Sequence, residues 1–216
     1  MRKRTMKQFA LTTIASCFFI SAYAVAPGFY MGIMTGPATN TGGTLYVQTM
    51  NNHLTAATPK STQWGTELFL GNKLNKYASI EGSLVSFGGV QYDTKNVPTC
   101  SSTQVRIKAL SVVGKGDISV GSFDVYGKGG ASVLYQTFSG DINANLSQPC
   151  GKSVYTTKIR PTFSIGASYD LTQSWVVDFS YNTWLTNGPS NNAILYGLGI
   201  SYHFVSQYCG QFLCDD

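Results

Sequence analysis

The sequence of 216 residues has few charged side chains, since Asp, Glu, Lys and Arg together make up 12% of it. Its formal net charge of +5 overstates even this, because four of the fifteen basic residues lie in the first seven positions. The remaining eleven basic and ten acidic residues nearly balance, and they form no Lys/Arg block. Binding to nucleic acid therefore has little electrostatic support.

Residue types that carry catalysis are also scarce. The chain has two histidines, His53 and His203, no Gly-rich phosphate loop and no His/Asp/Glu cluster with metal-ligand spacing. His53 follows two asparagines, where we expect an ordinary solvated histidine and hold a loop-borne base as the alternative. His203 has Ser201 two residues away, but a His–Ser pair alone is weak evidence for catalysis. We therefore expect no catalytic residues, no metal site and no cofactor.

Long apolar runs are missing too, because no stretch reaches the ~18 residues of a membrane-spanning helix. The N-terminus instead has the three parts of a secretory signal peptide, with basic residues from Arg2 to Lys7, an apolar run over 9–21 and a cleavage signature at Ala22-Tyr23-Ala24. We expect residues 1–24 to be removed. The alternatives are an uncleaved anchor, for which the run is short, and lipid attachment at Cys17 within a lipoprotein-like box.

Glycine and aromatic residues are plentiful, with 23 Gly, 13 Tyr and 12 Phe. Tyr and Phe favour strands, and Gly marks turns and close backbone approaches. Segments with a period of two follow the signal, most of them close to the ~9–11 residues that a tilted membrane strand requires. The eight segments are 28–36, 65–74, 77–88, 105–115, 121–135, 158–169, 173–185 and 193–204.

These segments tend to carry large apolar residues on one face and small or polar residues on the other. A water-soluble barrel or sandwich would show the same alternation with its apolar face inward. The inverted arrangement is favoured by aromatic residues near the ends of the apolar faces and by charges of balanced sign on the polar faces. The clearest apolar face belongs to the last segment, with Ile194, Tyr196, Leu198, Ile200, Tyr202 and Phe204.

Connections between the segments alternate in length, as tight periplasmic turns and longer outer loops do. The expected short ones are 75–76, 116–120 and 170–172, and the long ones are roughly 37–64, 89–104, 136–157 and 186–192. Eight strands also close without a free edge, which satisfies their backbone hydrogen bonds in lipid. We predict an all-β, eight-stranded antiparallel up-and-down transmembrane β-barrel over residues 25–204. Residues 44–50 are expected to extend the first hairpin above the membrane, with a ninth barrel strand as the alternative.

Several motifs recur in the order and spacing of a known family. They are Gly28-Phe29-Tyr30-Met31-Gly32, Glu67-Leu68-Phe69-Leu70-Gly71, Ser79-Ile80-Glu81-Gly82, Phe123-Asp124-Val125-Tyr126-Gly127-Lys128 and the stretch from Tyr196 to Phe204. With them the chain resembles the eight-stranded outer-membrane β-barrel family that includes the outer membrane protein A-type transmembrane domain. The resemblance implies that the protein lies in the outer membrane of a Gram-negative bacterium. We expect no periplasmic domain beyond a tail over 205–216.

The resemblance also implies roles for individual residues. The last strand is similar to the family's assembly signal, carried here by Tyr196, Leu198, Ile200, Tyr202 and Phe204, which makes the barrel-assembly machinery a partner. Relatives hold a network of charged side chains inside the barrel, although Ser168 stands where they often have an acid. The implied interior charges here are Glu67, Glu81, Arg106, Lys108, Asp124, Lys128 and Asp178.

Four cysteines follow the signal and divide between the two sides of the predicted membrane. Cys100 and Cys150 fall in long outer connections, and Cys209 and Cys214 fall in the periplasmic tail. We therefore predict disulfides Cys100–Cys150 and Cys209–Cys214, which an oxidising compartment permits. Four free thiols are the alternative, and a zinc site has little support because neither pair has a nearby His.

The outer connections are the expected carriers of function, because 37–64 and 136–157 are rich in Thr, Asn, Ser and Gly. The leading hypothesis is a monomeric structural or surface-interaction protein that contacts outer-membrane lipid, lipopolysaccharide or host surface molecules. A narrow ion or small-solute pore ranks second, since an eight-stranded interior is about filled by side chains. An outer-membrane lipid-modifying enzyme ranks third.

Overall fold

The computed structural model describes residues 28–42, 45–48, 54–57, 62–92, 103–139, 153–185 and 190–204. Nearly all of them lie in strands, and no helix among them has the length and hydropathy to cross a membrane. The strands are β1 (Gly28–Gly42), β2 (Leu45–Gln48), β3 (Leu54–Ala57), β4 (Thr62–Asn75), β5 (Ala78–Phe87), β6 (Val90–Tyr92), β7 (Thr103–Val120), β8 (Phe123–Ser139), β9 (Ser153–Asp170), β10 (Trp175–Trp184) and β11 (Ser190–His203).

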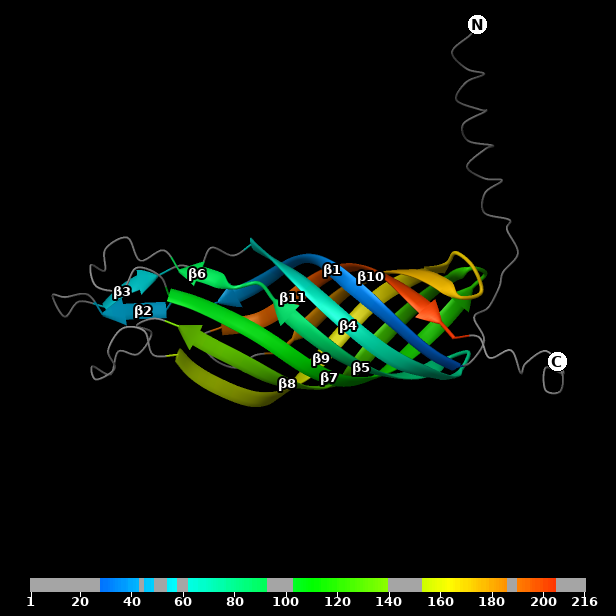
Figure 1. Ribbon diagram of the computed structural model, residues 1–216, viewed down its shortest axis with the longest axis horizontal. Helices are drawn as coiled ribbons and strands as arrows, with labels where there is room; N and C mark the ends of the chain where they lie inside the picture. The colour runs from blue at the N-terminus through cyan, green and yellow to red at the C-terminus, as the bar shows by residue number, and fades with distance from the viewer. Residues whose placement is uncertain are drawn as a thin grey trace, which may run out of the picture.

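The long strands close into one antiparallel barrel (Figure 1). Their order around it is β5-β4-β1-β11-β10-β9-β8-β7, and β5 pairs with β7 to complete the ring. The short β6 follows β5 after Gly88-Gly89 and pairs with the same neighbour, β7. The predicted eight-stranded up-and-down barrel is thus confirmed. The ring has no free edge, so each strand finds hydrogen-bond partners on both sides.

The barrel wall is apolar on its outside. Along β11, Tyr196, Leu198 and Ile200 point outward and are 42%, 61% and 40% exposed, whereas Leu195 and Ser201 are buried. A protein in water would bury its large apolar residues rather than display them around its whole circumference. The inverted arrangement predicted from the alternation is therefore the one that the chain adopts.

The two ends of the barrel differ in the length of their connections. At one end the connections are the turns 76–77, 121–122 and 171–174, and Gly121 has the left-handed φ of +66° that a tight turn uses. At the other end the strands are joined by the segments 43–61, 93–102, 140–152 and 186–189. We call the first the periplasmic end and the second the outer end, since bacterial barrels keep short turns in the periplasm.

Three expectations about the strands are settled by the structure. Residues 116–120 are not a connection but the end of β7, because Ile118 and Val120 continue its outward apolar face. Strands also reach further at the outer end than predicted, so that β9 begins at Ser153. The strand-like residues near 44–50 form β2, which pairs with β3 in a separate hairpin at the outer end and not in the barrel (Figure 1).

Candidate functional site

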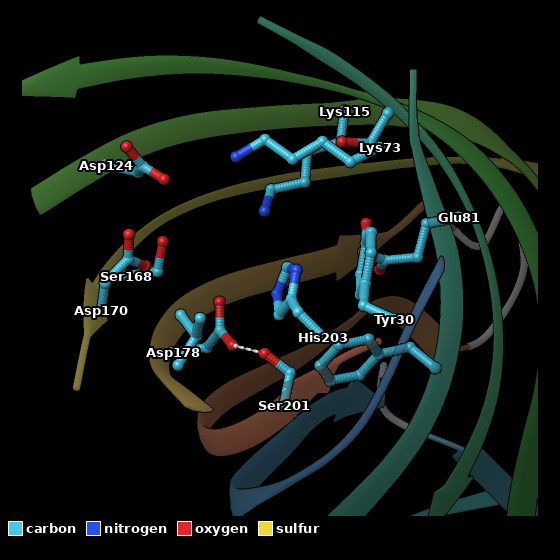
Figure 2. A pocket seen from close by; sticks show the side chains of 13 residues that line it. Tyr30, Lys73, Glu81, Lys115, Asp124, Ser168, Asp170, Asp178, Ser201 and His203 are labelled. Atoms are coloured by element: carbon cyan, nitrogen blue, oxygen red, sulfur yellow. Dashed lines mark hydrogen bonds between the residues drawn. The ribbon is translucent and has the colours of Figure 1, made fainter. Parts of the chain in front are cut away.

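The barrel interior gathers most of the buried polar side chains of the described residues, and it is organised in layers. A polar chamber lies at the periplasmic end, around a cavity of about 10 Å³ that has room for about one water molecule. Figure 2 shows its charged side chains, which come from β4, β5, β7, β8, β9 and β10. The chamber is lined by Tyr30, Phe69, Lys73, Ser79, Glu81, Lys115, Asp124, Ser168, Asp170, Val176, Asp178, Ser201 and His203.

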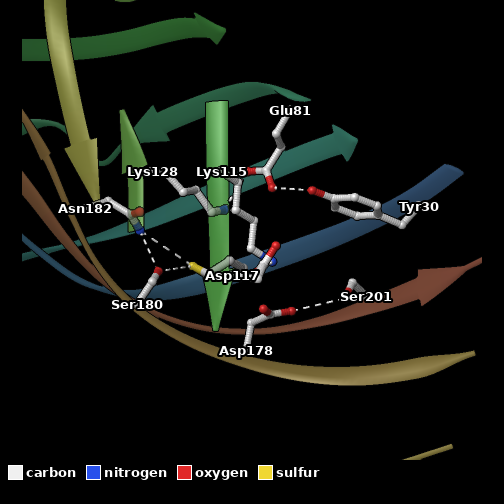
Figure 3. A network of polar contacts seen from close by, with 10 residues as sticks. Tyr30, Glu81, Lys115, Asp117, Lys128, Asp178, Ser180, Asn182 and Ser201 are labelled. Carbon is white, nitrogen blue, oxygen red and sulfur yellow. Dashed lines mark hydrogen bonds and ion pairs between the residues drawn. The ribbon is translucent and has the colours of Figure 1, made fainter. Parts of the chain in front are cut away.

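An ion pair inside the lumen links β5 and β8, the two neighbours of β7, at the inner side of this chamber (Figure 3). Lys128 Nζ on β8 lies 2.5 Å from Glu81 Oε1 on β5, and both side chains are almost completely buried. The hydroxyl of Tyr30, on β1, donates to the other oxygen of Glu81 over 3.0 Å. Lys128 Nζ also lies 5.2 Å from the ring centroid of Phe69. These contacts tie together three strands that are not paired with one another in the barrel wall.

Two further polar contacts involve carboxylates in or beside the chamber. Lys115 Nζ lies 3.1 Å from Asp117 Oδ1 within β7, and it stands 4.3 Å from the ring centroid of Tyr126. On the opposite wall, the hydroxyl of Ser201 donates to Asp178 Oδ2 over 3.0 Å. The chamber therefore combines acids and bases, and its lining holds four carboxylates and two lysines, Lys73 and Lys115.

Ser168 separates two acids in one row across the sheet. It is the register partner of Asp124 on β8 and of Asp178 on β10. Directly opposed side chains in such rows have Cβ atoms about 4.5–5.5 Å apart, and like charges there repel. A serine at this position therefore avoids three adjacent carboxylates, which explains the departure from the relatives' acid.

A neutral polar layer lies towards the outer end of the ion pair. The hydroxyl of Ser180 donates to the sulfur of Met34 over 2.8 Å, and Asn182 donates to Ser180 over 2.7 Å. Trp184 Nε1 donates to the hydroxyl of Ser111 over 3.2 Å. Each buried polar group in these contacts has a partner, as groups withdrawn from water require.

The outer part of the lumen is apolar. Its centre is an edge-to-face contact between Phe87 and Trp184, with ring centroids 5.2 Å apart. Residues from β1, β5, β7, β8, β10 and β11 surround these rings. The buried cluster comprises Ala38, Val85, Phe87, Ile107, Ala109, Leu134, Trp184, Ala193 and Leu195. We call this cluster the apolar layer. It occupies the lumen on the outer side of the polar layers.

The structure places most of the implied charge network inside the barrel, but not all of it. The residues that lie inside are Glu67, Glu81, Asp124, Lys128 and Asp178. The expectation does not hold for Arg106 and Lys108, whose side chains are exposed on the outer face of β7. Ile107 and Ala109 occupy the inward positions instead, and a period of two sends their neighbours outward.

Four interior charges were missed from the sequence. Lys73 shares the inward face of β4 with Glu67, so counting every second residue from Glu67 would have found it. Lys115 ends the predicted strand 105–115, and Asp117 lies in 116–120, the end of β7 that was interpreted as a connection. Asp170 ends β9 and lines the chamber.

His203 lies inside the barrel, where its ring makes a packing contact. Its ring stacks on Tyr30 with centroids 4.8 Å apart and 13° between the planes. Within the described ranges its side chain has no hydrogen bond to Ser201 or to a carboxylate, and no group of three or more His, Cys, Asp or Glu there could hold a metal ion. Ser201 donates to Asp178 instead.

The remaining predictions concern parts outside the described residues, or roles that the structure does not test. His53, all five cysteines, the signal peptide over 1–24 and the tail over 205–216 lie outside those residues. The disulfides Cys100–Cys150 and Cys209–Cys214 therefore stay predictions. The assembly-signal residues of β11 face outward, and Phe204 lies against Phe29 with ring centroids 6.0 Å apart, while their part in insertion stays a prediction.

Solved structures with the same fold come from outer membranes. Neisserial surface protein A aligns with a TM-score of 0.57 at 14% identity, covering 83% of this chain and 99% of that one. The outer membrane protein OprG from Pseudomonas aeruginosa aligns with a TM-score of 0.57 at 15% identity, covering 84% and 98%. At these identities the likeness shows the fold alone.

Comparisons of sequence give the family. A relative from Coxiella burnetii (strain RSA 493 / Nine Mile phase I), an uncharacterized protein, is 26% identical over 76% of this chain and 75% of its own length. The family described as "Outer membrane protein beta-barrel domain" matches residues 10–204. The chain therefore belongs to the outer membrane protein beta-barrel domain family, and its place is the outer membrane of a Gram-negative bacterium.

Proposed function

We propose that this protein is a surface-interaction protein whose barrel is a closed anchor for its outer connections. The observation that carries the proposal is the apolar layer, in which Phe87 and Trp184 are 4% and 2% exposed. A hydrated ion would have to shed water to pass such a layer, and burial of an unpaired charge is very costly. Apolar constrictions in channels close them for the same reason.

The ion pair below the apolar layer closes the lumen a second time. Lys128 on β8 and Glu81 on β5 meet inside the lumen, and Tyr30 on β1 contacts Glu81 there. Eight-stranded barrels have an interior that side chains just fill, and these residues are of the size to do so. A narrow pore, the second hypothesis from the sequence, is therefore less well supported than a closed anchor.

The charge of the outer end supports an interaction with an anionic surface. The segments 37–64, 89–108 and 136–160 contain seven basic and two acidic residues, a net formal charge of +5. The mature chain as a whole has a net charge of only +1, so the rest of it is net negative. A concentration of positive charge at one end attracts polyanions such as lipopolysaccharide or anionic host surfaces.

Conductance measurements test the closed anchor. The mature protein, refolded and inserted in planar lipid bilayers, should give no discrete conductance steps, while a wide porin under the same conditions gives them and shows that the assay is sensitive. Trp64→Ala, which changes an outward residue, is the matched control and should be equally silent. Regular, reproducible steps from the unchanged protein would favour the pore instead.

A further inference from the structure

Arg106 and Lys108 stand apart from the other charges of the barrel wall. All six acidic residues of the described strands, and the lysines of the chamber, lie on the interior side. Arg106 and Lys108 are exposed on the outside of β7, and within the described residues neither makes an ion pair or hydrogen bond. Two nearby outward cations without a partner among the described residues are available to an external anion.

The height of these cations follows from the residues below them on the same face. From Leu110 to Val120 the outward positions of β7 are all apolar or glycine. At ~3.3 Å per residue and a tilt of ~40°, this stretch rises about 25 Å, the height of the lipid-facing band in such barrels. Lys108 therefore stands directly above the hydrocarbon layer, and Arg106 one step higher, at the level of the outer-leaflet headgroups.

The surroundings of the two cations are polar beside them and apolar beneath them. Tyr135 lies directly across from Lys108 on β8, and Thr137 lies across from Arg106. The next outward-facing row towards the membrane is apolar across three strands and consists of Leu110, Val133 and Ile159. Leu110 is 44% exposed and Ile159 is 74% exposed. The surface thus offers positive charge and hydroxyl groups over a continuous apolar wall.

We propose that Arg106 and Lys108 bind the phosphate of a phosphorylated outer-leaflet lipid, the lipid A part of lipopolysaccharide, on the outside of the barrel. An arginine fork matches phosphate oxygens in a bidentate manner, and a lysine adds a mobile point charge. The apolar row below selects a lipid over a soluble polyanion, because the acyl chains lie against it while the phosphate meets the cations. The site belongs to the barrel wall and is independent of whether the lumen conducts.

Lipid titration of the mature protein tests this site. The protein is refolded in phosphatidylcholine vesicles, and the rise of its thermal unfolding midpoint with added lipid A gives an apparent affinity. Each cation near an anionic membrane surface contributes about 1 kcal/mol, so Arg106→Gln and Lys108→Gln should each weaken the affinity about fivefold, and the double variant about 25-fold. Lys76→Gln is the matched control, because this exposed lysine lies in the turn 76–77 at the periplasmic end, away from the proposed site. It should leave the affinity unchanged.

The other outcomes overturn the proposal. Unchanged affinity in both single variants and in the double variant would show that the cations take no part. Equal affinity for lipid A without its phosphates would show binding through acyl chains only. A midpoint shift by soluble dextran sulfate that equals that of lipid A, and that the double variant abolishes, would assign the cations to a soluble polyanion.

Discussion

Lys128 and Glu81 form an ion pair whose side chains are 6% and 2% exposed, so bulk water solvates neither. Removing such ions from water costs several kcal/mol each, and their attraction offsets this only with good geometry and additional hydrogen bonds. Tyr30 supplies one of these bonds through its hydroxyl. The stability of the centre of the barrel therefore depends on both charges being present together.

Lys128→Met should lower the free energy of unfolding by about 3–5 kcal/mol, because it leaves Glu81 buried without its partner. Urea unfolding followed by tryptophan fluorescence in one fixed lipid or detergent measures the loss. The double variant Lys128→Met/Glu81→Gln should recover much of it, since no unpaired charge remains. Equal losses in the single and double variants would contradict the role given to the pair.

Alternation along the strands was enough to place some residues but not others. It places Glu81 and Lys128 inside, yet their contact depends on barrel closure and on the lengths of both side chains. Arg106 and Lys108 were misplaced because charges were expected to turn away from lipid. That expectation holds within the hydrocarbon layer and fails just above it, where an outward cation meets headgroups rather than acyl chains.

The first and last strands of the barrel, β1 and β11, pair with each other at a seam that closes the ring. Closure of the barrel depends on this seam. At Gly36 the two strands come so close that an added Cβ would lie 1.9 Å from the carbonyl oxygen of Tyr196. A Cβ never fits at that distance from backbone, so the strands would have to separate. Gly116, on β7, is different, because the nearest atom to its Cβ would be 4.0 Å away.

Gly36→Ala should therefore loosen the seam and lower the free energy of unfolding by about 1–3 kcal/mol, the range for overpacked sites. Gly116→Ala is the control and should stay within about 0.5 kcal/mol of the unchanged protein. Urea midpoints, together with the fraction that keeps its folded mobility on gels without heating, measure both. Equal changes in the urea midpoints of the two variants would contradict the claim that the close approach at Gly36 limits stability.

Whole strands were more predictable than their ends. The face of β11 from Tyr196 to Phe204 is regular enough to give its strand and its outward side directly. The end of β7 was misread because Gly116 and Asp117 look like the start of a turn, whereas Asp117 pairs with Lys115 inside the barrel. Local composition cannot distinguish a turn from polar residues whose partners lie inside a barrel.

The molecule as a whole is asymmetric along the barrel axis. Its polar chamber is at the periplasmic end, its apolar layer lies nearer the outer end, and the outer segments have the excess of positive charge. Alternation alone places Trp184 on the inward face of β10, but only closure brings it against Phe87 from β5. The filling of the interior by side chains was therefore predicted from the sequence as an expectation of size and not as a particular set of contacts.

Both proposals require the long connections to lie outside the cell and the short turns in the periplasm. An epitope inserted within 141–149, compared with the same epitope in the turn at 76–77, tests this most directly in cells, with heat-modifiable mobility on gels as the check of folding. Antibody should label intact cells for the first insertion and only permeabilised cells for the second. Labelling of intact cells through the turn at 76–77, with the insertion in 141–149 hidden, would contradict the orientation and both proposals with it.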